Sequence, residues 1–104
     1  MPTKSATPPE AARDDDAAAD ARRRLQVDVG ARVRAVRTRL GVGQAECARA
    51  AGVDTSSLFR LEKGDQNVTI DMIGRLAVAL GVEMDELLVG VRPDPAIVAQ
   101  RPRA

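Results

Sequence analysis

Apolar residues recur at helical spacing in five segments of the chain, and a glycine follows each segment. These glycines are Gly41, Gly52, Gly64, Gly81 and Gly90. Glycine is favoured directly after a helix because the residue there often adopts a positive φ angle. No segment alternates apolar and polar positions at a period of two with β-branched residues, so strands are not expected. The pattern predicts an all-α domain of five helices.

The expected helices span residues 29–40, 44–51, 55–63, about 70–80 and 84–88. Asp54 and Thr69 stand directly before the third and fourth helices, where short polar side chains cap helix N-termini. The residues expected to face inward on the first and fourth helices are Val29, Val33, Val36, Leu40, Ile70, Ile73, Leu76, Ala77 and Leu80. Arg32, Arg34, Arg37 and Arg39 flank the first stripe, either as a solvated face or as phosphate contacts.

The two ends differ in composition from this central domain of residues 25–90. Residues 1–24 form an N-terminal arm, in which residues 1–13 are expected to be disordered and residues 14–25 to be frayed helix or coil. The arm fits either a solubilising tail or a segment that touches DNA or a partner. Residues 91–104 contain three prolines and are expected to be a flexible tail, from which Ile97 and Val98 are able to dock.

The second and third expected helices have the side chains that a DNA-reading helix pair requires. Ala48 is small enough for a close crossing, and Gly52 suits the positive φ of a tight turn. The residues expected to pin the pair to the core are Cys47, Ala51, Val53, Leu58 and Leu61. The outer face of the third helix then carries Thr55, Ser56, Ser57, Arg60 and Lys63. Such a face fits a major groove about 12 Å wide.

Residues 29–88 resemble the phage-repressor/Cro type of helix-turn-helix, also called the xenobiotic-response-element family. The resemblance is carried by "VGARVRAVRTRLGVGQAECARAAGVDTSSLFRLEKG" and "NVTIDMIGRLAVALGVEMDELL". It implies a five-helix, lambda-repressor-like DNA-binding domain. Three residues depart from the family pattern. Gly43 stands where the family usually has a Ser, Thr or Asn cap, and Cys47 stands where it has Leu. Phe59 stands where a polar residue is common.

The resemblance also implies roles for individual residues. Gln44 would hold a phosphate beside a helix N-terminus. Thr55, Ser56, Ser57 and Phe59 would meet base edges, and Arg60 and Lys63 would contact bases or backbone. Glu62 would pair with Arg37 and hold the helices in register. Phe59 is open to two interpretations: contact with a thymine methyl group, or packing against its own helix or the following loop.

Composition narrows the classes of function. The net charge is +1, so DNA binding would depend on where the basic residues lie rather than on their excess. The chain has one cysteine and no histidine, which argues against a disulfide framework, a zinc site and a Ser/His or Cys/His catalytic pair. No apolar run reaches membrane-spanning length, and the N-terminus lacks an apolar signal region. We expect a cytoplasmic protein that is not an enzyme and has no metal, cofactor or small-molecule ligand.

These features predict a bacterial transcriptional regulator, such as a repressor, that binds double-stranded DNA as a homodimer on a pseudo-palindromic operator. The expected dimer surface comprises Met84, Leu87, Leu88, Val89 and Val91, which exceed what one small core needs. One alternative is a controller protein of a restriction–modification system or an antitoxin with the same domain. Another is a protein-interaction module that no longer contacts DNA.

Overall fold

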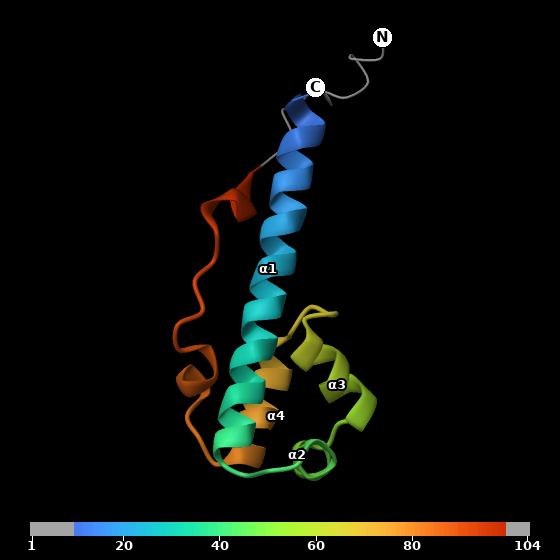
Figure 1. The fold of residues 1–104 in the computed structure, drawn as a ribbon, viewed down its shortest axis with the longest axis vertical. Helices are drawn as coiled ribbons and strands as arrows, with labels where there is room; N and C mark the ends of the chain where they lie inside the picture. The colour runs from blue at the N-terminus through green and yellow to red at the C-terminus, as the bar shows by residue number, and fades with distance from the viewer. Residues whose placement is uncertain (1–9, 100–104) are drawn as a thin grey trace.

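The computed structural model describes the backbone of residues 10–99 and the side chains of residues 16–99. Its helices are α1 (Glu10–Arg39), α2 (Gln44–Ala51), α3 (Thr55–Lys63) and α4 (Ile70–Leu80), followed by the 3₁₀ helices η2 (Met84–Leu88) and η3 (Pro95–Val98) (Figure 1). This described part contains no strand, which confirms the all-α prediction. The fifth expected helix is a 3₁₀ helix, so the described part has four α-helices rather than five.

α1 begins far earlier than the sequence pattern predicts. It runs without interruption through residues 14–25, where frayed helix or coil was expected, and it includes residues 10–13. Ala18 and Ala21 are buried, which gives the alanine-rich turns a docking face that needs no large apolar side chain. The helix also continues through Gly30. Residues 1–9 of the expected disordered segment lie outside the described residues.

The C-terminal segment returns alongside the N-terminal half of α1, which extends beyond the other helices (Figure 1). Asp94 connects the two segments, because its carboxylate accepts hydrogen bonds from the Ala96 N–H and the Arg24 guanidinium, both at 2.8 Å. These bonds, first that from Ala96 and then that from Arg24, lower the pKa of Asp94 below its ordinary value. Ile97 is half-buried while Val98 is exposed. This part of the expected tail therefore packs against the folded domain.

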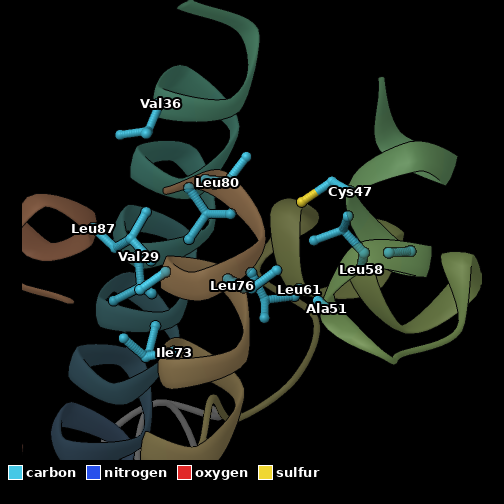
Figure 2. Packing of buried hydrophobic residues seen from close by; sticks show 13 residues of the cluster. Val29, Val36, Cys47, Ala51, Leu58, Leu61, Ile73, Leu76, Leu80 and Leu87 are labelled. Atoms are coloured by element: carbon cyan, nitrogen blue, oxygen red, sulfur yellow. The ribbon is translucent and has the colours of Figure 1, made fainter. Parts of the chain in front are cut away.

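The hydrophobic core lies where the C-terminal half of α1 meets α2, α3, α4 and η2 (Figure 2). Its fully buried side chains are Val33, Val36, Cys47, Leu58, Leu61, Leu76 and Leu87. The predicted inward faces are confirmed except at two positions. Leu40 is 41% exposed because α1 ends one residue before it, and Ile70 is 76% exposed at the first position of α4.

The helix ends follow the glycine pattern closely. All five predicted glycines have positive φ angles of 70–80°. Thr69 caps α4 as expected, since its hydroxyl accepts a hydrogen bond from the Met72 N–H at 3.0 Å. Asp54 occupies the N-cap position of α3, but its side chain makes no capping hydrogen bond. Within residues 10–99, no helix is both long and apolar enough to cross a membrane.

Candidate nucleic-acid interface

α2 and α3 form a tightly joined pair. Ala48 is 1% exposed, which leaves room for the helices to cross closely. Gly52 takes a φ of 72°, and this lets the Val53 N–H donate to the Ala48 carbonyl at 2.9 Å. Any side chain at this position would be strained. Val53, Leu58 and Leu61 then pack the pair onto the core. The orientation of α3 is thus fixed by buried contacts.

A buried ion pair ties α1 to the end of α3. The Arg37 Nε donates to Glu62 Oε2 at 2.7 Å, and the Arg37 Nη2 donates to Glu62 Oε1 at 2.8 Å. These side chains are only 10% and 4% exposed. The hydrogen bonds to Glu62 outweigh burial and raise the pKa of Arg37 above its ordinary value. The pair has the bidentate geometry in which Arg–carboxylate interactions are strongest.

Two further groups join this pair, and the sequence assigned neither of them to it, because Gln44 was expected to hold a phosphate. Arg37 Nη1 donates to the Val42 carbonyl at 2.8 Å, in the loop between α1 and α2. The Gln44 side-chain amide, at the start of α2, donates to Glu62 Oε1 at 3.0 Å. Gln44 is half-buried, and this hydrogen bond orients its amide. The network connects three helices at the edge of the outer face of α3.

The outer face of α3 is polar and accessible. Thr55, Ser56 and Arg60 are exposed, and Ser57 is half-buried. The Ser57 hydroxyl accepts a weak hydrogen bond from Arg60 Nη2 at 3.4 Å. None of these four side chains belongs to the hydrophobic core, and the exposed side chains of Thr55, Ser56 and Arg60 are accessible from solvent.

Phe59 lies on this face and is 49% exposed. The Lys63 ammonium sits 5.0 Å from the centre of its ring, within range of a cation–π interaction. Contact with its own helix is therefore present in the structure. The residue as a whole nevertheless remains half exposed, so a ligand is able to reach it.

The arginines that flank the apolar stripe of α1 separate into two groups. Arg32 donates to the Glu86 carbonyl at 2.8 Å and to its carboxylate at 3.1 Å, and Arg39 lies 3.5 Å from the same carboxylate. These two arginines face η2. Arg34 instead lines a surface depression beside α3, together with Arg37, Gln44, Phe59, Glu62 and Lys63. Arg34 therefore belongs to the candidate interface, although its spacing alone did not distinguish it from Arg32.

The residues expected to form a dimer surface do not all lie on one face. Met84, Leu88 and Val89 are 39%, 41% and 56% exposed, and Val91 is half-buried against the core. Leu87 is fully buried. Its place at the expected surface is corrected by the structure, because the 3₁₀ turn points this side chain into the core.

No cluster of three or more potential metal ligands occurs among the residues that the structure describes. Cys47 is fully buried, and burial raises the pKa of its thiol above the ordinary value. Its side chain packs in the core among apolar neighbours.

The helix-turn-helix domain family matches residues 28–88. A restriction–modification controller protein, C.AhdI from Aeromonas hydrophila, is 39% identical, with a TM-score of 0.58 over 60% of this chain and 94% of that one. ClgR, the clp gene regulator from Corynebacterium glutamicum, is 31% identical, with a TM-score of 0.61 over 62% of this chain and 84% of that one. No curated protein matches.

The matched region contains the α2–α3 pair and the exposed face of α3, and it excludes the whole N-terminal half of α1. Both named structures contain regulators, and their similarity covers about the same share of this chain. The chain therefore belongs to the helix-turn-helix family of the phage-repressor/Cro type, a family of DNA-binding transcription regulators.

Proposed function

We propose that the protein regulates transcription by placing the outer face of α3 in the major groove of a specific DNA operator. The observation that carries this proposal is a polar, exposed helix face on a helix pair that buried contacts hold rigidly. Thr55 and Ser56 offer hydroxyl groups, and Arg60 offers a guanidinium that is able to bind a guanine edge. A site held by packing and a buried ion pair is ready to bind without rearrangement.

The dimensions of α3 support this placement. Its nine residues rise about 1.5 Å each, so the helix is about as long as the major groove is wide. With the Thr55 end at the base edges, Lys63 lies at the rim of the groove, where the phosphates are. Gln44 and Arg34 border the same depression as Lys63 and extend the phosphate-facing surface. Their contacts would set the register of α3 on the DNA.

We further propose that two copies bind a pseudo-palindromic operator. The support is the exposed apolar set Met84, Leu88 and Val89 on and after η2. Met84 also lines an apolar groove with Ile70 and Val78 of α4, which are 76% and 81% exposed. Exposed apolar residues that adjoin in this way favour a protein contact. Two recognition helices about 34 Å apart would then meet successive turns of one DNA face.

Substitution of Arg60 tests DNA reading by α3. Arg60→Ala removes an exposed side chain from the outer face, and Arg49→Ala removes an equal charge from the last turn of α2 as the matched control. We expect Arg60→Ala to weaken operator binding by roughly 1–3 kcal/mol with little change in thermal stability. Retention of full regulatory function by Arg60→Ala would favour the interaction-module alternative instead.

A second candidate is a controller of a restriction–modification system. The observation in its favour is the 39% identity to C.AhdI over 94% of that protein. The same domain would then regulate a nuclease and methyltransferase rather than an unlinked set of genes. Neighbouring genes for these two enzymes would support this role, whereas a neighbouring toxin gene would favour an antitoxin.

A further inference from the structure

The middle of α1 crosses the end of α3 in close contact. Backbone atoms of Val27 approach Gly64, directly after α3, so closely that a Cβ on Gly64 would lie 2.6 Å from the Val27 Cα. Gly30 packs in the same way against the Leu61 and Glu62 backbone. Arg23 stands one helical turn before Val27, and Arg34 stands one turn after Gly30. The face of α1 that crosses α3 therefore carries an arginine on each side of the crossing.

A second surface depression lies on the Arg23 side of this crossing. Its lining residues are Ala19, Arg22, Arg23, Gln26, Gly64 and Asp65. Arg22 and Arg23 are exposed, and neither forms an ion pair with any residue in the described part of the chain. Asp65, the carboxylate in this lining, lies 3.9 Å from Lys63 Nζ. The depression therefore has an excess of positive charge.

The adjacent Arg24 has a different environment. Its guanidinium donates to Asp94 of the C-terminal segment at 2.8 Å. Of three consecutive arginines, one holds the C-terminal segment and two line the depression beside the end of α3. This division makes a solely solubilising role for Arg22 and Arg23 a poor explanation of their placement.

We propose that Arg23, together with Arg22, binds the phosphate backbone of duplex DNA beside the half-site that α3 reads. The inference rests on the proposed function, which puts Lys63 at the rim of the major groove. Arg23 lies beyond Lys63 on the far side of the crossing with α1, so it meets backbone outside the contacted bases. Arg34, Lys63 and Arg23 then form a line of cations along the α1–α3 seam.

This placement gives a nearly neutral protein a local attraction for a polyanion. The net charge is only +1, and Asp16 and Asp20 lie further along α1 toward its N-terminus. Those carboxylates would repel DNA, so the contact is confined to the turn that holds Arg22 and Arg23. That turn precedes residue 28, where the family match begins, and is an addition to the shared domain.

The experiment compares the full chain with Arg23→Gln, Arg22→Gln/Arg23→Gln and the control Arg24→Gln, which changes the same charge on the same turn. The probes are a duplex recovered by selection from random DNA and a random-sequence duplex of equal length. Binding is measured across a salt series, and circular dichroism checks that each variant remains folded. The log–log salt slope of affinity should fall by about 0.9 for each phosphate that Arg23→Gln no longer binds. The reduction should be similar on both duplexes, because a phosphate contact carries no sequence information.

Three results overturn the inference and are distinguishable from one another. A slope for Arg23→Gln equal to that of the unaltered chain means that Arg23 touches no phosphate. Equal reductions in Arg23→Gln and Arg24→Gln mean that only overall charge matters. Failure of the unaltered chain to bind any selected duplex removes the proposed function itself. Support requires a reduced slope in Arg23→Gln with the Arg24→Gln slope unchanged.

Discussion

At the scale of single residues, Glu62 is a nearly buried carboxylate that links three helices. Its carboxylate is 4% exposed and accepts hydrogen bonds from Arg37 and Gln44. Burying a carboxylate costs free energy unless partners satisfy its oxygens. Here the partners come from α1 and α2, so the same bonds that satisfy the charge also orient α3. Stability and the proposed DNA reading therefore depend on the same side chain.

Replacement of Glu62 should be far more damaging than replacement of an exposed carboxylate. Glu62→Ala leaves the Arg37 guanidinium largely buried without its partner, and we expect the free energy of unfolding to fall by about 3 kcal/mol. Asp71→Ala breaks the exposed Asp71–Arg75 pair and should cost less than about 1 kcal/mol. Urea unfolding of both variants measures the difference. Equal, small decreases would contradict a structural role for the Glu62 network.

Cys47 should be inert while the protein is folded. The thiol is fully buried and burial raises its pKa, so at pH 8 both access and thiolate formation are suppressed. Unfolding exposes the thiol and lowers its pKa toward the ordinary value. Iodoacetamide should therefore modify Cys47 in urea and leave it unmodified in buffer. A similar rate of modification in both conditions would show that the α2 packing is open.

Of the contacts at the candidate site, the sequence predicted only the ion pair between Arg37 and Glu62. Arg37 and Glu62 were matched through the resemblance, and the structure places them in contact. The hydrogen bonds of Gln44 and Val42 to this pair depend on how three segments converge, which no local pattern encodes. Arg32 and Arg34 both flank the apolar stripe, so the sequence does not distinguish them. In the structure Arg32 faces η2 and Arg34 lies beside α3.

At the scale of elements, the helix ends depend on local sequence, whereas the length of α1 depends on a segment distant in the chain. Glycine positions predicted the helix ends correctly because a positive φ is a local requirement. The N-terminal half of α1 was missed because small alanines, rather than large apolar residues, form its docking face. Its partner is the proline-containing segment around η3, some seventy residues away in the chain. That pairing explains why both expected tails are ordered between residues 10 and 99.

Two helix glycines should respond in opposite directions to the same substitution. Gly30→Ala places a Cβ against the Leu61 and Glu62 carbonyl oxygens, so α1 and α3 must separate, at a cost of about 1–3 kcal/mol. Gly74→Ala in α4 meets no atom within 4 Å and should stabilise the protein by up to about 1 kcal/mol. Thermal unfolding of the two variants provides the comparison. Stabilisation by Gly30→Ala would show that the helices do not approach this closely.

At the scale of the whole molecule, the proposed function has to account for DNA binding by a protein with almost no net charge. The net charge of +1 supplies little general attraction for DNA. In the proposed function, specific affinity comes from two copies bound together and from cations placed along the α1–α3 seam. Non-specific binding is correspondingly expected to be weak. The sequence alone showed that the net charge is small, but only the structure shows where the basic side chains lie.

The apolar surface on η2 should control assembly. Leu88→Glu introduces a charge at a half-exposed apolar position and should convert a dimer to a monomer in sedimentation experiments. Val98→Glu, at an exposed position on η3, is the matched control and should leave the dimer intact. Operator affinity should fall only in Leu88→Glu. A monomeric parent protein at micromolar concentration, with and without DNA, would exclude the dimer.

Selection of bound duplexes from random DNA addresses DNA reading by α3 with the fewest assumptions. We predict an enriched motif with two inverted half-sites whose centres lie about one helical turn apart. We also predict that Arg60→Ala weakens or relaxes the motif at one position in each half-site. Absence of any enriched sequence, or an identical motif with Arg60→Ala, would contradict DNA reading by the outer face of α3.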